Sequence, residues 1–151
     1  MRLGLCVVAA ALLFPATAVA RTDAGWQLAL SWPADGTVTS PFGIDGSRRH
    51  AGLDIGILQS IGVRAAADGV VTKVGYVTGF EGYGNVVMVA HRAGYSTLYA
   101  HLSLPLARLG QKVWRGQSIG VAGCTGWCTG THLHFELRYR DLAIDPSLLM
   151  Y

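Results

Sequence analysis

The sequence has little charge. Only 14% of its 151 residues are Asp, Glu, Lys or Arg, and the formal net charge at pH 7 is +3. So small a charge excludes the dense basic surface of nucleic-acid-binding proteins, and we therefore expect no nucleic-acid partner. Apolar residues, by contrast, make up 51% of the chain, and glycine occupies 20 positions. This composition excludes general disorder and favours one turn-rich globular domain with a modest core.

Long apolar runs are missing from all but the N-terminus. The first twenty residues carry a positive charge at Arg2, an apolar run over residues 3–14 and the small-residue tripeptide Ala18-Val19-Ala20, a pattern typical of a secretory signal peptide. The apolar run is shorter than the roughly 20 residues of a membrane-spanning helix. We therefore expect residues 1–20 to be a signal peptide and the remainder to be exported without stable membrane insertion, an uncleaved anchor being the alternative.

Cysteine is also scarce, with three residues in the chain. Cys6 lies within the expected signal peptide, which leaves Cys124 and Cys128 in the exported part. An even number of cysteines in an exported protein indicates a disulfide, which would stiffen the short segment between them. Two free thiols or a pair of metal ligands are the alternatives. The brevity of the chain and an exported disulfide favour the periplasm over the extracellular medium.

Short apolar or alternating runs, rich in Val, Ile, Thr and Tyr, recur between glycines from Gly36 onward. They predict many short β-strands joined by tight turns. We read residues 21–36 as a short lead-in and residues 37–151 as a single domain, and we expect a helical turn only at 104–109 and near 146–150. The runs lie at residues 63–67, 69–76, 85–91, 96–101, 112–114, 118–122 and 132–139.

The last of these runs carries polar side chains on one face. Strict alternation in segment 132–137 places His132, His134 and Glu136 on one face of a strand, and apolar side chains on the other. The apolar face would pack against the core. The two imidazoles are therefore expected to point away from it, on the same side of the sheet.

A second polar pair lies near the start of the domain. His50 and Asp54 are four residues apart, and the neighbouring glycines argue against a helix, so we expect both on one side of an extended strand. Two imidazoles and one carboxylate form the ligand set of an open, catalytic zinc site, whereas closed structural sites use four protein ligands. Such a zinc ion lowers the pKa of bound water to about 7 and polarises a carbonyl group. The pattern predicts a hydrolytic metal centre.

The chain lacks a His-Glu-x-x-His segment, in which a glutamate serves as the base of thermolysin-like enzymes. A histidine outside the ligand set must then handle the proton. His101 and His132 are the candidates, and the sequence does not decide between them.

These residues, in this order, resemble the M23 family of zinc metallopeptidases, the lysostaphin and LytM type of peptidoglycan endopeptidase. His50-x3-Asp54 resembles the first metal motif of the family and His132-x-His134 the second, while the segment 99–102 resembles the histidine segment between them. The resemblance extends over residues 37–149. Further segments that resemble the family, in its order, are 40–43, 65–71, 82–85, 94–98, 116–120 and 145–146.

The resemblance implies a mostly β fold, a single antiparallel sheet or sandwich domain with the metal site in a groove. It implies one Zn²⁺ per chain, held by His50, Asp54 and His134, with His101 and His132 acting on the water and stabilising the oxyanion. The implied activity is that of an endopeptidase that hydrolyses stem peptides or cross-bridges of bacterial peptidoglycan, in cell-wall remodelling or lysis. Peptidoglycan is then the partner of a monomer, together with any regulatory or targeting protein.

One departure from the family pattern is visible. Cys124 and Cys128 occupy a loop where the family more often carries Ser or Thr, which affects the stiffness of that loop. Trp127 lies between them and is a candidate for the wall of a substrate groove, although aromatic residues in β proteins more often serve packing.

Three other functions fit parts of the sequence. A cell-wall-binding or amidase-activating module of the same fold would need no ligands, so the intact ligand set argues against it. A biotinyl or lipoyl carrier attaches its cofactor to a lysine at a hairpin tip, and neither Lys73 nor Lys112 lies at an evident tip. Non-haem iron oxygenases also use two histidines and a carboxylate, but commonly with a closer His-x-Asp spacing.

Two further polar residues stand outside the predicted site. His91 follows an apolar run at a strand end and is expected to be an ordinary structural histidine. Glu136 has two interpretations: it orients a ligand imidazole, or it forms a surface ion pair with Arg138, two residues along the same face.

Overall fold

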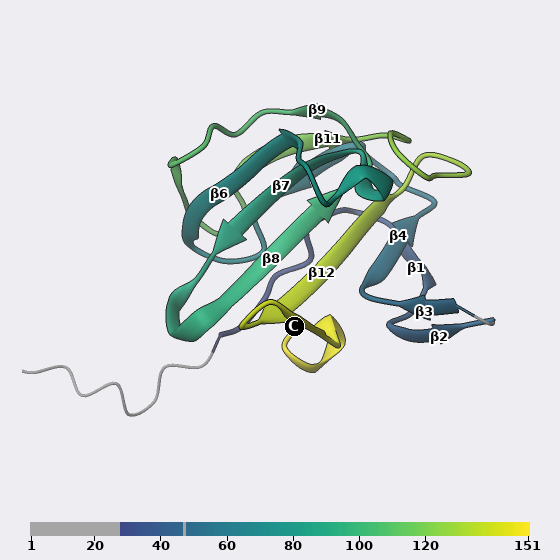
Figure 1. Ribbon diagram of the computed structural model, residues 1–151, viewed down its shortest axis with the longest axis horizontal. Helices are drawn as coiled ribbons and strands as arrows, with labels where there is room; N and C mark the ends of the chain where they lie inside the picture. The colour runs from purple at the N-terminus through teal and green to yellow at the C-terminus, as the bar shows by residue number, and fades with distance from the viewer. Residues whose placement is uncertain (1–27, 47) are drawn as a thin grey trace, which may run out of the picture.

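The computed structural model describes residues 28–46 and 48–151 (Figure 1). The expected signal peptide, residues 1–20, and the first part of the lead-in lie outside the described residues. Within the described part, no helix is long and apolar enough to cross a membrane. The strands are β1 (Thr37–Ser40), β2 (Gly43–Asp45), β3 (Arg48–His50), β4 (Leu53–Gly56), β5 (Gly62–Arg64), β6 (Gly69–Tyr76), β7 (Asn85–Ala90), β8 (Tyr95–Ala100), β9 (Leu102–Pro105), β10 (Lys112–Val113), β11 (Ser118–Ala122), β12 (Leu133–Tyr139) and β13 (Leu142–Ile144). Short 3-10 helices follow at η1 (Glu81–Tyr83), η2 (Arg92–Gly94) and η3 (Pro146–Leu148).

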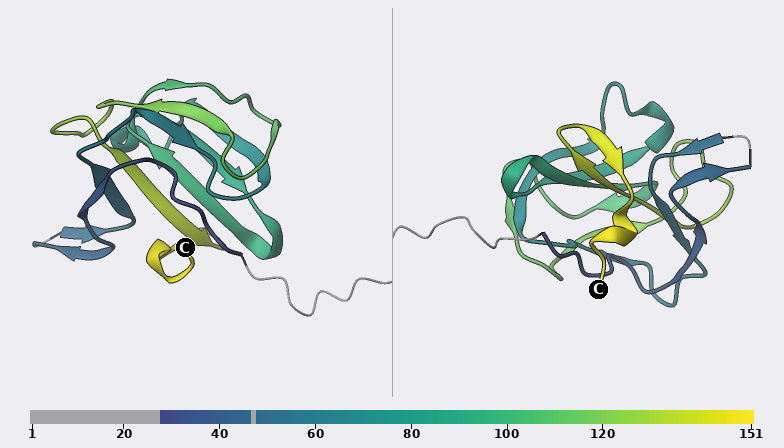
Figure 2. Two further views of the ribbon diagram at one scale, coloured as in Figure 1. Left: turned by 180° about the vertical axis from the view of Figure 1, so that it is seen from behind. Right: turned by 90° about the horizontal axis from the view of Figure 1, so that it is seen from below.

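Most strands belong to one antiparallel sheet, in the order β1-β4-β12-β8-β7-β6-β10, with β13 paired to β12. A smaller sheet, β5-β11-β9, lies across it, and the β2-β3 hairpin stands out at one side (Figures 1 and 2). This architecture confirms the expected mostly β, antiparallel domain.

The main core lies between the large sheet and the small one, because a single cluster of buried side chains includes residues of both. Tyr99 and Phe135 come from the large sheet, and Val63 and Ile119 from the small one. The opposite face of the large sheet carries a smaller buried cluster, against which Phe80 and Tyr83 pack. The two sheets therefore form a sandwich, and the η1 segment covers part of the outer face of the large sheet.

Strand β12 shows the alternation expected from the sequence. Leu133, Phe135 and Leu137 belong to the main core, whereas His134 and Glu136 point to the other face, as period-2 geometry requires. Strand β12 pairs with β4 on one side and with β8 on the other. It is therefore an interior strand of the sheet, with a paired neighbour on each side.

The helical turn expected at residues 104–109 is wrong. Residues 104–105 belong to strand β9, whose backbone pairs with β11, Val121 lying opposite Leu104, and residues 106–109 form neither helix nor strand. Leu104, Leu106 and Leu109 are largely exposed, so the leucine spacing does not mark a buried helical face. The turn expected near 146–150 does form, as η3.

The two ends of the described chain meet. A parallel bridge joins Leu30 to Met150, the backbone N–H of Leu30 donates to Leu149 O (2.8 Å), and that of Tyr151 donates to Leu30 O (3.1 Å). The described part of the lead-in, residues 28–36, is therefore part of the domain fold.

Candidate metal centre

The register of β12 brings two of the predicted ligands together. His134 lies directly opposite Asp54 of β4 and opposite Ala100 of β8 on the other side. His101 follows β8 immediately, so it lies one residue beyond the neighbour of His134. The central sheet thereby gathers residues that are up to 80 positions apart in the sequence.

His50 and Asp54 do not share a strand, contrary to the expectation from their spacing. Four residues of continuous strand would separate their Cα atoms by about 13 Å, whereas His50 Nε2 lies 3.2 Å from Asp54 Oδ1. The chain bends between β3 and β4, at Ala51 and Gly52. Gly52 is needed there because a Cβ atom would collide with the carbonyl oxygen of Phe135. The pair converges through a bend.

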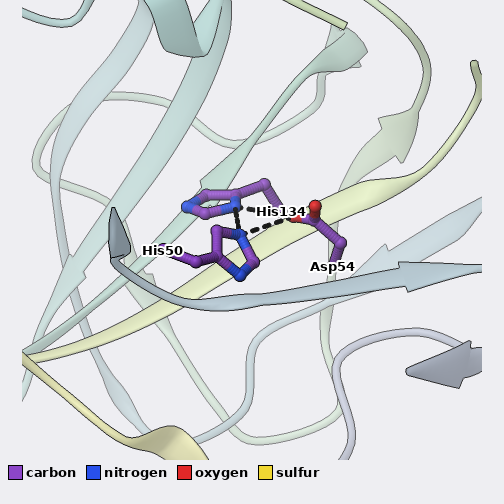
Figure 3. A group of neighbouring side chains, drawn as sticks. All are labelled: His50, Asp54 and His134. Carbon is purple, nitrogen blue, oxygen red and sulfur yellow. Dashed lines mark hydrogen bonds and ion pairs between the residues drawn. The ribbon is translucent and has the colours of Figure 1, made fainter. Parts of the chain in front are cut away.

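The three predicted ligands face one point (Figure 3). His134 Nδ1 lies 2.7 Å from Asp54 Oδ1 and 3.1 Å from His50 Nε2, and His50 Nε2 lies 3.2 Å from the same carboxylate oxygen. His134 is buried, while the other two are partly exposed. One side of the cluster is therefore open to solvent.

In His50 and His134, the ring nitrogen that faces away from the cluster carries the proton, because its partner is an acceptor. His50 Nδ1 donates to the carbonyl oxygen of Pro41 (2.7 Å), which can only accept. His134 Nε2 donates to Glu136 Oε1 (3.0 Å). In the neutral rings, His50 Nε2 and His134 Nδ1 are left with lone pairs that face each other and the Asp54 carboxylate. Such an arrangement requires a cation between the three atoms, either a proton or a metal ion.

The pKa shifts of His134 and Asp54 also indicate a site that favours a cation. Burial lowers the pKa of His134, but the hydrogen bonds to Asp54 and Glu136 and the charges of both carboxylates outweigh it and raise the pKa to about 9. Burial raises the pKa of Asp54, but the hydrogen bond and charge of His134 and the neighbouring histidines hold it below its usual range. The site favours positive charge, and a set of two nitrogens and one oxygen fits zinc.

His101 and His132 lie beside this cluster. Their ring centroids are 4.8 Å apart, and that of His101 is 5.9 Å from that of His134. His132 Nε2 lies 3.8 Å from Asp54 Oδ1. His101 has a φ of 59°, a left-handed conformation that is uncommon outside glycine and often marks a functional position.

Both of these histidines are oriented by backbone carbonyl groups. His101 Nδ1 donates to Thr125 O (2.8 Å), and His132 Nδ1 donates to Gly130 O (2.7 Å). The neutral rings therefore carry their lone pairs on Nε2. Burial lowers the pKa of His101, more than its bond to Thr125 raises it, so His101 is neutral near pH 7 and able to accept a proton.

Glu136 is a site residue that the sequence left undecided. Its carboxylate is fully buried and accepts from His134 Nε2 and, at 2.6 Å, from Arg138 Nε. Both interpretations thus describe real contacts, but the ion pair is buried and not at the surface. The signal available in the sequence was the position of Glu136 on the same strand face as His134.

The loop after β11 supplies the carbonyl groups that hold the two histidines. The structure joins Cys124 to Cys128 by a disulfide, and Thr125 lies inside the closed loop. The Thr125 hydroxyl donates to Leu102 O (2.9 Å) and accepts from the N–H of Asn85 (3.0 Å). Trp127, at the outer edge, is 82% exposed.

The cluster opens into a groove of about 530 Å³. Its walls are the η1 segment, residues 123–132 between β11 and β12, which we call the disulfide loop, and the end of the β2-β3 hairpin. Trp127, the candidate from the sequence for a groove wall, is among the lining residues. The groove is lined by Arg49, His50, Ala51, Asp54, Gly79, Phe80, Glu81, Gly82, Tyr83, His101, Trp127, Cys128, Thr129, His132 and His134. An extended chain lying in it would pass directly over the three facing ligand atoms.

His91 lies outside the groove. Its Nδ1 donates to Asp68 O (2.7 Å), and its Nε2 is hydrogen-bonded to the Thr97 hydroxyl (2.9 Å). These contacts tie the end of β7 to the turn before β6, which is a structural role.

Comparisons with known proteins agree with this geometry. Residues 48–146 match the family model described as Peptidase family M23. The chain is 42% identical over 115 residues to the DD-carboxypeptidase/endopeptidase Mpg of Neisseria meningitidis serogroup B, covering 72% of this chain and 26% of that protein. It is 37% identical over 115 residues to the murein hydrolase activator NlpD of Salmonella dublin, covering 76% and 29%. The chain spans less than half the length of the curated relatives it matches.

Solved structures share the fold. The catalytic domain of the antimicrobial peptidase lysostaphin from Staphylococcus simulans superposes with a TM-score of 0.60 at 30% identity, over 78% of this chain and 87% of that one. A zinc containing peptidase from Vibrio cholerae superposes with a TM-score of 0.65 at 35% identity, over 78% and 39%. The match extends over most of the described chain.

Proposed function

The chain belongs to peptidase family M23, and from that premise we propose that it is a zinc metalloendopeptidase that hydrolyses peptide bonds in bacterial peptidoglycan. The observation that carries the proposal is the convergence of three lone-pair donors, from His50, Asp54 and His134, with two further histidines beside them. A domain that only binds would have no use for the proton-accepting nitrogens of His101 and His132.

In this proposal, His50, Asp54 and His134 hold one Zn²⁺. Bound zinc supplies a water of lowered pKa near neutral pH and polarises the scissile carbonyl group. The open side of the cluster faces the groove, so a peptide lying there presents its carbonyl carbon to the attacking water. The surrounding walls orient the chain and limit access of bulk solvent.

His101 and His132 manage the proton. The Nε2 atom of one ring takes a proton from the attacking water and returns it to the leaving amine, as a general base and then a general acid. The other ring donates a hydrogen bond to the oxyanion once it is protonated. The carbonyl groups of Thr125 and Gly130 accept from Nδ1 of the two rings and so keep each Nε2 atom free to act on the substrate.

The substrate class follows from the family and the relatives. We propose that the enzyme cuts within stem peptides or cross-bridges, as a monomer and with residues 37–151 as its peptidase domain. We further propose that residues 1–20 direct export of the enzyme and that it acts in the periplasm, which the brevity of the chain and its disulfide favour. A regulatory or targeting protein is a second expected partner.

The competing function is a murein hydrolase activator without hydrolytic activity. The relative named as such an activator, at 37% identity, supports considering it. Such a protein would retain the groove for a partner, but its ligand residues would be dispensable. The two functions therefore differ in what happens when a ligand is removed.

The test uses purified protein loaded with zinc and cross-linked peptidoglycan, with products followed by liquid chromatography and mass spectrometry. We expect cross-linked dimers to disappear with the wild type and to persist with His134→Ala. A chelator should abolish the activity and added zinc should restore it. If wild type and variant leave every muropeptide intact despite bound zinc, the activator function becomes the better account.

A further inference from the structure

Among the residues that the structure describes, Glu136 is the one buried carboxylate that contacts a predicted ligand on the side of the ring away from the cluster. Its relative exposure is 0%, and both of its oxygens are engaged. Oε1 accepts from His134 Nε2 (3.0 Å) and from the Tyr83 hydroxyl (2.7 Å), and Oε2 accepts from Arg138 Nε (2.6 Å). A buried carboxylate is costly unless it is paired and hydrogen-bonded, so this network has a use that outweighs the cost.

We propose that Glu136 is a positioning residue for zinc binding, because it holds the proton of His134 on Nε2 and so presents the lone pair of Nδ1 to the metal. The identity of the metal rests on the proposed function. The position of the proton on His134 is a property of this chain that can be measured without any substrate.

The side of the ring that carries the proton decides whether His134 can be a ligand. A neutral imidazole has one donor and one acceptor nitrogen. With the proton on Nδ1, the N–H group would point at Asp54 Oδ1 and His50 Nε2, which lie 2.7 and 3.1 Å away. Both atoms would then accept a hydrogen bond from this N–H group, and its proton would occupy the position of the metal ion.

Tyr83 and Arg138 hold Glu136 in the position that prevents this. Arg138 compensates the negative charge from the far oxygen, and its guanidinium lies 5.4 Å from the centroid of the Phe80 ring, which fixes its direction. The Tyr83 ring lies against His134, with centroids 5.5 Å apart. The network therefore restrains the carboxylate from two sides and the imidazole from one.

The decisive variant is Glu136→Gln, which keeps the shape and removes the charge. His134 Nε2, the Tyr83 hydroxyl and Arg138 Nε are all donors, and the amide offers them a single oxygen. When that oxygen turns to Arg138, the amide NH₂ faces His134 Nε2 and moves its proton to Nδ1. We expect zinc affinity, measured by competition with a chromogenic chelator, to fall by about 10- to 100-fold.

A second readout separates positioning from a merely structural role. Nitrogen-15 spectra of the histidine rings, recorded without zinc near pH 10, should show His134 protonated on Nε2 in the wild type and on Nδ1 in Glu136→Gln. In the comparison variant, Tyr83→Phe, one donor to Glu136 is lost but the carboxylate remains, so His134 should keep its proton on Nε2 and zinc affinity should fall less than in Glu136→Gln.

An unpaired Arg138 would destabilise the single variant, so the double variant Glu136→Leu/Arg138→Met removes both charges together and leaves His134 Nε2 with no acceptor at position 136. Zinc affinity within twofold of the wild type in a folded variant, with the His134 proton still on Nε2, would overturn the proposal. Peptidoglycan hydrolysis does not enter either readout, so failure of the proposed function and failure of this inference are distinguishable.

Discussion

Gly52 is the residue on which the short distance between His50 and Asp54 depends. An added Cβ would collide with the Phe135 carbonyl oxygen and lie 2.9 Å from Cγ of Glu136, and backbone atoms cannot move aside as a flexible side chain does. We expect Gly52→Ala to lower the free energy of unfolding by about 1–3 kcal/mol, the usual cost of overpacking. Chemical denaturation followed by circular dichroism measures it.

Gly62→Ala is the matched control for that substitution. Its Cβ would find only the Ser60 hydroxyl, 3.9 Å away, and Gly62 belongs to the same domain, at the start of β5. The control should lose no stability, because alanine restricts the unfolded chain more than glycine does. Equal losses in the two variants would show that the close approach at Gly52 is not the cause.

His91 closes a buried chain of hydrogen bonds that is sensitive to pH. The chain runs from His91 to the Thr97 hydroxyl, on to the Tyr99 hydroxyl (3.0 Å) and to the N–H of Ala66 (2.7 Å). Burial lowers the pKa of His91, although its bond to Asp68 O opposes this effect. The folded protein therefore prefers the neutral ring.

The sign of the pH effect follows from that preference. Above the unfolded pKa of 6.5 neither state binds the proton, and the stability contributed by the neutral ring is fully present. As the pH falls below 6.5 towards the folded pKa, the unfolded chain binds the proton first and stability is lost. We expect His91→Asn to flatten the loss of unfolding free energy below pH 6.5, in denaturation series against pH. An unchanged slope in the variant would assign the effect to other groups.

For Glu136, the sequence predicted the strand face that carries its side chain but not the contacts that its carboxylate makes. Alternation along β12 placed it on the face of His134, which was right. Whether that face is covered depends on Tyr83, 53 positions away in the η1 segment, and no local pattern reports such a contact. The five predicted histidine and aspartate positions were accessible because their motifs are local, whereas the network behind them is not.

At the scale of elements, the disulfide loop is the support of the two proton-handling histidines. Thr125 and Gly130 each offer a carbonyl group to one ring, while the ligands His50 and His134 take no such bond from this loop. Opening the loop should therefore disturb proton transfer and leave the metal ligands in place.

The double variant Cys124→Ser/Cys128→Ser tests this separation of roles. We expect zinc stoichiometry to stay at one per chain and kcat on peptidoglycan to fall by about tenfold to a hundredfold, since small misplacements of catalytic groups cost that much. Reducing the wild type should give the same result. A loss of zinc, or an unchanged kcat, would contradict the assigned role of the loop.

Strands were predictable where apolar residues alternate, and less so where leucines are exposed. The runs at 69–76, 85–91 and 132–139 correspond closely to β6, β7 and β12. A helical turn was expected at residues 104–109, whereas residues 102–105 pair as β9 at the edge of the small sheet and residues 106–109 form neither helix nor strand. Edge pairing uses backbone groups, which leave no signature in side-chain periodicity.

At the scale of the whole molecule, the predicted class was right and the pairing could not be derived. Many short strands followed from the composition and alternation of the sequence, and the antiparallel domain was what the family resemblance implied. The register that sets His134 opposite Asp54 joins segments 80 residues apart, and many registers are compatible with the same alternation. Only the resemblance of ordered motifs indicated that these residues meet.

The bridge between Leu30 and Met150 determines where a flanking polypeptide would be attached relative to the groove. Both ends of the described chain lie at one place, near the C-terminal end of β12, whereas the loop that shapes the groove precedes the N-terminal end of that strand (Figure 1). A polypeptide fused to either end would thus be tethered at the same spot, clear of the groove mouth. Lengthening a linker at either terminus would extend the reach of the groove into a polymer mesh without obstructing its entrance.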